Sequence, residues 1–182
     1  MKALVTGASS GIGLEISKYL DSIGYEIILV ARDKEKLESV AKTLTHKPKI
    51  IVMDLQQVED IKSLYVLVKN DDIDILVNNA GFGLFGNFTE TDLSKELNMI
   101  DINIKAVHIL TKLFLKDMKR KNKGYILNVA SSAAFQSGPL MATYYSTKSY
   151  VYRLTEAINY ENKKDKVNVQ VSCLCPGPVD TN

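Results

Sequence analysis

Short apolar runs alternate with helical segments along the whole chain, and this alternation restricts the fold more than any other feature. The runs cover residues 2–5, 26–31, 49–53, 74–77, 125–129 and 167–174. They are rich in Val, Ile and Leu, and several show little apolar–polar alternation, as expected of strands buried on both faces of a parallel sheet. Strands separated by helices need crossovers that place helices on both faces. The sequence therefore predicts an α/β fold, a Rossmann-like doubly wound parallel sheet with strand order 3-2-1-4-5-6.

The helical segments carry their own boundary signals. Two long helices are expected near residues 99–119 and 144–162. Asp33 and Thr89 are predicted to cap helix N-termini, and Gly24 stands where a glycine ends the first helix.

Size and charge exclude several classes of protein. At about 150 residues per domain, 182 residues predict one domain. A balance of 23 basic against 21 acidic residues, net +2, argues against nucleic acid and acidic membrane surfaces as partners. No apolar run reaches the ~18 residues of a membrane span, and the first strand begins too early to leave room for a signal peptide. A soluble, reduced, cytoplasmic protein is expected.

Metal and disulfide sites are not predicted. His46 and His108 are far apart, with no cluster at ligand spacing. Cys173 and Cys175 share one face of a predicted strand, where their spacing suits packing and not a relaxed disulfide. The basic run at 116–123 is explained as a solvated helix C-terminus, and nucleic acid is not expected to bind there.

A glycine-rich loop follows the first strand. Gly7, Gly11 and Gly13 allow a tight turn and a close approach of backbone, and the following helix offers free N–H groups to a pyrophosphate. The alternative is a glycine-rich turn without a ligand, but the strand–turn–helix context favours a nucleotide site. The predicted contacts in this loop are Gly7, Ser9, Ser10, Gly11, Ile12 and Gly13.

A second glycine pattern, G-x-G-x-x-G at 81–86, also follows a strand. No helix opens directly from it, since Asn87 and Phe88 intervene before Thr89. It is therefore interpreted as a loop beside the substrate pocket and not as a second nucleotide site.

The end of the second strand bears on the choice of cofactor. An acidic residue there would receive the ribose hydroxyls of NAD, whereas a basic one suits the 2′-phosphate of NADP. Here Ala31 ends the strand and Arg32 follows, and its guanidinium can hold a phosphate. The neighbouring Asp33 weakens this argument, and its alternative role is to cap the next helix. The sequence predicts NADP(H) over NAD(H).

The pattern Tyr-x-x-x-Lys places a phenol and an ammonium one helical turn apart, where the cation favours ionisation of the phenol. The chain contains it three times, as Tyr65/Lys69, Tyr144/Lys148 and Tyr160/Lys164. Tyr144 differs because a predicted strand at 124–129 leads into Ser131 and Ser132 shortly before it. A hydroxyl at the carboxyl end of such a strand faces the crevice where doubly wound sheets bind ligands.

Taken together, the sequence resembles the short-chain dehydrogenase/reductase family, in its single-domain branch. The resemblance spans almost the whole chain and rests on four motifs in order: Thr6-Gly7-x-x-x-Gly11-x-Gly13, Asn78-Asn79-Ala80-Gly81, Tyr144-x-x-x-Lys148 and Pro176-Gly177.

The resemblance implies catalytic roles. Tyr144 would exchange a proton with the substrate oxygen, and Lys148 would lower its pKa and hold the nicotinamide ribose. Ser131, favoured over Ser132 by its distance from Tyr144, would hydrogen-bond the substrate carbonyl. Asn103 would sit in a helix, hold a water and connect Lys148 to solvent; its alternative is a polar residue in an apolar helix.

The resemblance also implies cofactor contacts. Asp54 and Leu55 would contact adenine, and the segment Asn79, Ala80 and Gly81 would run beneath the adenine ribose. The segment along the nicotinamide would contribute Pro176, Gly177, Val179 and Thr181.

The resulting hypothesis is an NADP(H)-dependent oxidoreductase acting on a carbonyl or secondary alcohol; the alternatives are a nucleotide-binding regulatory module without turnover and a structural protein on the same scaffold. Residues 1–182 are expected to form one catalytic domain that lacks the family's C-terminal lid and last strand. The two long helices carry surplus apolar residues, which predicts a homodimer or homotetramer. An apolar substrate pocket is expected from Phe82, Leu84, Phe85, Phe135, Leu140 and Met141.

Overall fold

The computed structural model, which describes residues 1–179, forms one six-stranded sheet. All neighbouring strands are parallel, in the order β3-β2-β1-β4-β5-β6, as the alternation predicts. The strands are β1 (Lys2–Thr6), β2 (Glu26–Ala31), β3 (Lys49–Val52), β4 (Ile73–Asn78), β5 (Gly124–Val129) and β6 (Val169–Leu174). The strand order reverses between β1 and β4. Doubly wound sheets bind ligands beside such a switch point.

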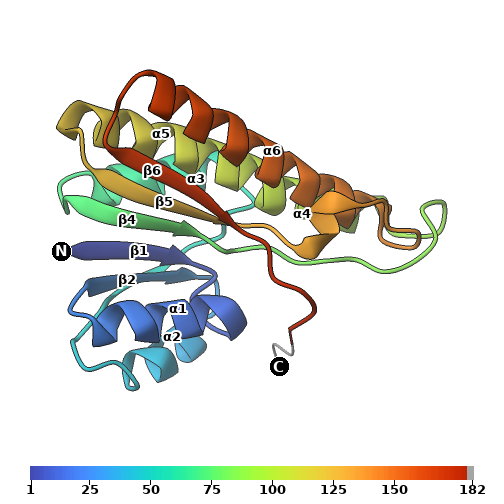
Figure 1. The fold of residues 1–182 in the computed structure, drawn as a ribbon. Coiled ribbons are helices and arrows are strands. Elements are labelled where there is room, and N and C mark those ends of the chain that lie inside the picture. Colours follow the sequence, from blue (N-terminus) through green and yellow to red (C-terminus); the bar gives the residue numbers. More distant parts are fainter. Residues whose placement is uncertain (180–182) are drawn as a thin grey trace.

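Helices cover both faces of the sheet (Figure 1). Helices α1 and α2 lie on one face, and α3, α4, α5 and α6 lie on the other. The helices are α1 (Gly11–Ser22), α2 (Lys34–Ala41), α3 (Val58–Val68), α4 (Leu93–Ile100), α5 (Val107–Lys121) and α6 (Ala142–Lys164). Two short elements complete the fold, the π-helix η1 (Asp101–Ala106) and the 3₁₀ helix η2 (Ser132–Phe135).

The central strands are buried on both faces, which explains why their sequences are apolar without alternation. In β1, Leu4 packs into the core under α3 and α5, whereas Ala3 and Val5 pack into the core under α1 and α2. All three side chains are fully buried. A polar side chain at any of these positions would have to be buried on one face or the other.

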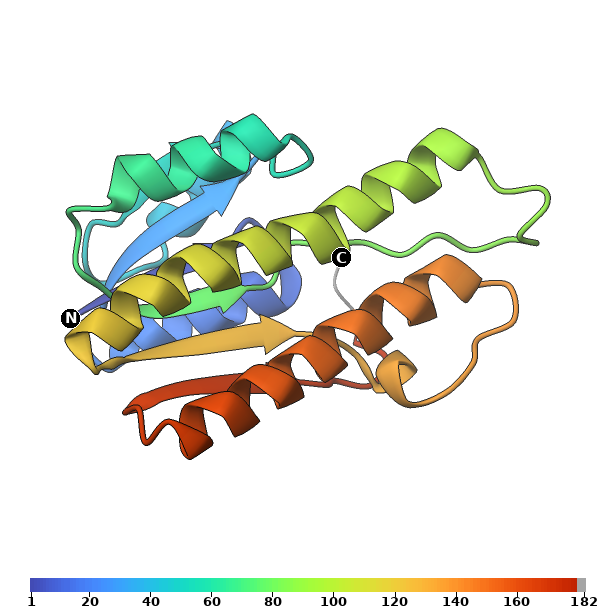
Figure 2. The same ribbon diagram turned by 90° about the horizontal axis from the view of Figure 1, so that it is seen from above.

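The first long helix begins earlier than predicted. Helices α4, η1 and α5 run on as one continuous helix beside α6 (Figure 2). The predicted cap at Thr89 is wrong, because the carboxylate of Asp92 accepts from the Lys95 N–H and caps α4. The cap at Asp33 is confirmed by its bond from the Lys36 N–H, and Gly24 follows the end of α1 as predicted.

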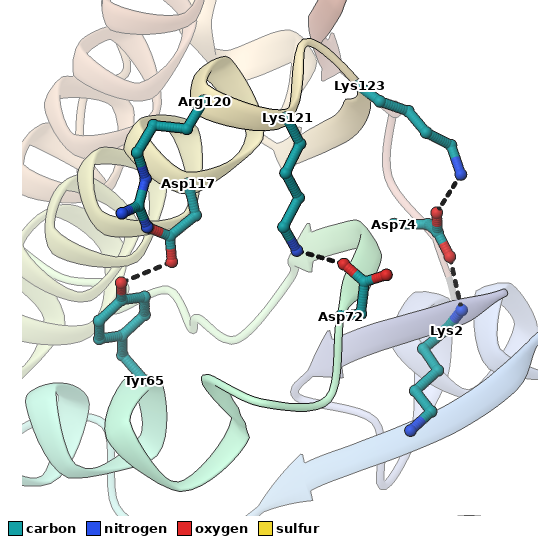
Figure 3. A network of polar contacts seen from close by, with 8 residues as sticks. All are labelled: Lys2, Tyr65, Asp72, Asp74, Asp117, Arg120, Lys121 and Lys123. Atoms are coloured by element: carbon teal, nitrogen blue, oxygen red, sulfur yellow. Dashed lines mark hydrogen bonds and ion pairs between the residues drawn. The ribbon is translucent and has the colours of Figure 1, made fainter.

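Ion pairs join the amino-terminal end of β4 to the C-terminal end of α5 (Figure 3). Lys121 pairs with Asp72, and the Lys123 ammonium lies 2.7 Å from Asp74. The other carboxylate oxygen of Asp74 accepts from the Lys2 backbone N–H at 2.9 Å. Lys121 and Lys123, two cations of the basic run at 116–123, are therefore neutralised by carboxylates within the fold. Within residues 1–179, no helix is both long and apolar enough to span a bilayer.

Candidate active site

A cleft of about 900 Å³ opens at the carboxyl ends of the strands. It runs from the loop after β1, past the end of β2, to the first turns of α6. The predicted site residues that line it are Gly7, Ser9, Ser10, Gly11, Ile12, Arg32, Leu55, Asn79, Ala80, Gly81, Ser131, Tyr144, Lys148, Pro176, Gly177 and Val179. Gly13, Asp54 and Asn103 are not among its walls, and Thr181 lies outside the described residues.

The loop after β1 is held by close backbone contacts. Gly7 has a φ of +63°, and a Cβ there would lie 2.8 Å from the Ala80 Cα. A Cβ on Gly13 would lie 2.3 Å from the Gly7 carbonyl oxygen, so Gly13 serves the approach of helix to loop and not the wall of the cleft. The Asn79 amide nitrogen donates to the carbonyl oxygens of Thr6 and Gly7, at 3.1 Å each. This places the β1 loop and the end of β4 in one rigid unit.

Thr6, the first residue of the glycine motif, belongs to this unit, in a role that the sequence analysis did not predict. Its hydroxyl accepts from the backbone N–H groups of Asn79 at 3.0 Å and Ala80 at 3.1 Å, and donates to the Val77 carbonyl. A hydroxyl-bearing residue at the last position of a buried strand is the signal that could have indicated this role.

The N-terminus of α1 faces the cleft and fits a pyrophosphate. Ser10 stands at the N-cap, and within residues 1–179 its side chain makes no capping bond. The N–H groups of the first helical turn are thus available to a ligand, and the positive end of the helix dipole favours an anion. Gly11 and Ile12 of that turn line the cleft.

Two cationic side chains stand at the far end of the cleft. Arg32 and Lys36 both line it, and the Arg32 guanidinium lies 3.9 Å from an Asp54 carboxylate oxygen. Asp33, whose charge weakens the argument for NADP, accepts the bond that caps α2 and also lines the cleft. Lys36 was not predicted, because the sequence pattern does not show that the first turn of α2 faces the cleft.

Lys148 is deeply buried at the base of the cleft, with 6% of its surface exposed. Its ammonium donates to the Val129 carbonyl oxygen at 3.0 Å and lies 5.7 Å from the centre of the Tyr144 ring. Burial lowers the pKa of Lys148 to about 8. The hydroxyl-rich or anionic surface of a ligand would restore part of the solvation that burial removes.

Ser131 and Ser132 both line the cleft. The Ser131 hydroxyl accepts from the Ala133 N–H at 3.2 Å and caps η2, which fixes its rotamer near the end of β5. The Ser132 backbone N–H donates to the Pro176 carbonyl, which ties the two loops together. The choice of Ser131 over Ser132 stays a prediction.

Asn103 lies within the π-helix and is 1% exposed. Its Oδ1 accepts from the Phe82 N–H at 3.1 Å, and its Nδ2 donates to the Phe82 carbonyl at 2.9 Å and the Thr147 hydroxyl at 3.0 Å. A Cβ on Gly81 would lie 2.7 Å from that Oδ1 and 3.6 Å from the Lys148 ammonium, which locates Asn103 behind Gly81. Its amide fixes the loop after β4; the predicted water relay stays a prediction.

The apolar wall of the cleft is smaller than predicted. Phe82 and Met141 line it together with Tyr145. Leu84, Phe85, Phe135 and Leu140 are not among its walls; Phe85 is 71% exposed, and the Phe135 ring packs edge-on against Tyr152. The loop 81–86 passes close to Tyr144, since a Cβ on Gly83 would lie 3.3 Å from its ring. No helix opens from this loop before α4, in agreement with its interpretation as a wall of the pocket.

The other two Tyr-x-x-x-Lys pairs have structural roles or none. The Tyr65 hydroxyl donates to Asp117 at 2.5 Å (Figure 3), and Tyr160 is exposed near the end of α6. Neither pair lines the cleft.

Comparisons with known proteins agree with this geometry. The sequence model described as "short chain dehydrogenase" matches residues 1–182. An uncharacterized oxidoreductase of Staphylococcus saprophyticus is 35% identical over 185 residues, covering 98% of this chain and 78% of that protein. A solved metagenomic short-chain oxidoreductase in complex with NADP is 32% identical with a TM-score of 0.90, covering 98% of this chain and 83% of the other.

A second solved structure, a short-chain dehydrogenase from Sphingobium yanoikuyae in complex with NADPH, is 28% identical. Its TM-score is 0.92, and the match covers 99% of this chain and 72% of that one. The cleft, the parallel sheet and these matches lead to one conclusion: this chain is an oxidoreductase of the short-chain dehydrogenase/reductase family.

Proposed function

We propose that the protein interconverts a small-molecule carbonyl and the corresponding secondary alcohol with NADP(H). One observation carries the proposal: Ser131, Tyr144 and Lys148 line the same cleft as the glycine loop after β1. Hydroxyl, phenol and ammonium groups thus stand beside a surface suited to a dinucleotide.

The chain's residues divide the cofactor between two regions. The first turn of α1, with Gly11 and Ile12, would hold the pyrophosphate, and Leu55 and Ala80 would lie along the adenosine half. Pro176, Gly177 and Val179 would contact the nicotinamide half, and all these residues line the cleft. When bound, the nicotinamide supplies or accepts the hydride.

Tyr144 and Ser131 act on the substrate oxygen. During reduction negative charge grows on that oxygen; Tyr144 donates its proton there, and Ser131 donates a hydrogen bond to the same atom. Lys148 stabilises the ionised phenol and holds the ribose. These roles are in keeping with the rigid placement of Ser131 at the η2 cap and of Lys148 against Val129.

Two cations support a preference for NADP(H) over NAD(H). Arg32 and Lys36 line the end of the cleft beyond β2, where the adenosine ribose lies in this fold. Asp54 lies 3.9 Å from Arg32 and partly neutralises its charge. Lys36 supplies a further positive charge at this end of the cleft. Two solved neighbours are complexes with NADP or NADPH. We also propose an apolar substrate, because Phe82, Met141 and Tyr145 line the cleft. A cytoplasmic location is part of the same proposal.

The test is NADPH consumption with a panel of ketones and aldehydes, followed by nicotinamide absorbance, together with NADPH binding followed by its fluorescence. Binding with turnover of at least one carbonyl is the expected result. Binding without turnover across the panel would favour a nucleotide-binding regulatory module, and absence of binding would contradict the proposal entirely.

A further inference from the structure

Two thiols that the proposed chemistry does not use lie directly behind the cleft. Cys173 and Cys175 lie two residues apart at the end of β6, and their sulfur atoms are 3.8 Å apart. Both side chains are half-buried and pack against the small apolar cluster of Val107, Ala130 and Val151. The sequence contains these two cysteines and no others.

The geometry permits a bond between them, although a strained one. Residues two apart on an extended strand have Cα atoms about 6.6 Å apart, near the upper limit of about 6.8 Å for a disulfide. Rotation of the side chains can bring the sulfur atoms to about 2.05 Å, but a relaxed disulfide has Cα atoms about 5.5–6 Å apart, so the bond is expected to draw the backbone at Cys173 and Cys175 together. Such a disulfide is more easily reduced than a relaxed structural one.

A shift at Cys175 is transmitted to Ser131 by two backbone hydrogen bonds. The carbonyl of Leu174 accepts from the Ala130 N–H at 2.8 Å, and the carbonyl of Pro176 accepts from the Ser132 N–H at 2.8 Å. Cys175 and Ser131 thus occupy the middle of two paired tripeptides. Movement of one tripeptide moves or breaks its bonds to the other.

We propose that Cys173 and Cys175 form a peroxide-oxidised thiol pair, whose reversible disulfide loosens the segment that carries Ser131. The oxidant is a hydroperoxide. The sulfur of Cys175 attacks its terminal oxygen, which gives a sulfenic acid and releases water or an alcohol. The sulfur of Cys173 then displaces the sulfenic hydroxyl as water. Overall, the two thiols lose two protons and two electrons, and the peroxide accepts them.

The order of these steps follows from the different surroundings of the two thiols. Burial, with contributions from neighbouring Cys175, raises the pKa of Cys173 to about 12, so Cys173 remains a thiol and is the poorer first nucleophile.

The test is intact-mass spectrometry of the protein before and after hydrogen peroxide, and again after dithiothreitol. The wild-type chain is expected to lose two hydrogen atoms with peroxide and regain them with dithiothreitol. Cys173→Ser should instead stop at a sulfenic acid that dimedone traps on Cys175, and Cys175→Ser should resist the same peroxide dose. Hydrogen exchange of the Ala130 and Ser132 amides should quicken in the disulfide form.

Several outcomes would overturn the proposal. An unchanged wild-type mass, a disulfide between two chains, or oxygen added to Cys175 without loss of hydrogen would refute the pair. A disulfide that leaves exchange at Ala130 and Ser132 unchanged would refute its link to Ser131. None of these readouts uses turnover, so they are independent of the proposed function.

Discussion

The Lys148 ammonium donates to the Val129 carbonyl oxygen, 3.0 Å away, from a position that is almost completely shielded from solvent. The last residue of β5 therefore fixes the cation that the proposed chemistry places beneath Tyr144. A charged group in such surroundings costs stability in the free protein and is retained because the site needs it.

This cost leads to a prediction for Lys148→Met. The folded pKa, about 8, lies below the unfolded value of 10.5. Below pH 8 the buried charge exerts its full cost, and this cost falls as pH rises from about 8 to 10.5, because the folded state then loses the proton first. Removal of the charge should raise the free energy of unfolding at pH 7 by about 1–2 kcal/mol, once loss of the bond to Val129 is allowed for.

Denaturant unfolding measures this effect, and the advantage of the variant should shrink above pH 8. The same variant should bind NADPH weakly and have no turnover. Lys164→Met, in the Tyr160/Lys164 pair outside the cleft, should change neither stability nor binding. A Lys148→Met protein less stable than wild type at pH 7 would contradict the argument.

Ser131→Ala and Ser132→Ala should separate the two candidate hydroxyls. Loss of the donor to the substrate oxygen should lower kcat about 10²–10³-fold in Ser131→Ala, as for one oxyanion-type donor. Ser132→Ala should be mild, because its link to the fold is the backbone bond to Pro176, which alanine keeps. Steady-state kinetics on one accepted carbonyl provides the comparison. A larger defect in Ser132→Ala would reverse the choice of serine.

Arg32→Asp should invert the cofactor preference. The new carboxylate repels the 2′-phosphate and accepts the ribose hydroxyls, so NADPH affinity should fall by about 10–100-fold while NADH affinity rises. Lys36→Met should weaken NADPH binding alone. Lys34→Met, outside the cleft, serves as the matched control in the same fluorescence titration. Tighter binding of NADH than of NADPH by the wild-type protein would show the argument from Arg32 to be wrong.

The outer faces of α5 and α6 predict a homo-oligomer, although fewer apolar residues are left for an interface than the sequence suggested. Much of their predicted apolar surplus packs into the core, including Leu110 and Phe114. Leu113 and Leu154 belong to neither the large core clusters nor their half-buried surroundings, and remain for an interface.

Light scattering at micromolar concentration should therefore detect a dimer or tetramer. Leu113→Glu should dissociate it, and Val66→Glu, on the exposed side of α3, should not. A strictly monomeric wild-type protein would refute this prediction.

The sequence predicted the fold well where burial on both faces constrains residue type, as in β1. It failed at the start of α4, because Leu93 and Leu97 there are exposed and give no core-facing pattern. It failed again for the pocket wall, because the conformations of Phe85 and Phe135 depend on loops and neighbouring rings that have no periodicity. The hydrogen-bonding role of Thr6 and the position of Lys36 were missed for a similar reason: both depend on which groups meet across the crevice.

The most direct test of the central claim is the comparison of Tyr144→Phe with Tyr145→Phe. Both rings line the cleft, but only the Tyr144 hydroxyl is proposed to pass a proton to the substrate. Turnover of an accepted carbonyl and NADPH affinity are measured for both variants. Tyr144→Phe should lose turnover and bind NADPH nearly as wild type does, whereas Tyr145→Phe should keep both. Substantial turnover by Tyr144→Phe would contradict the account.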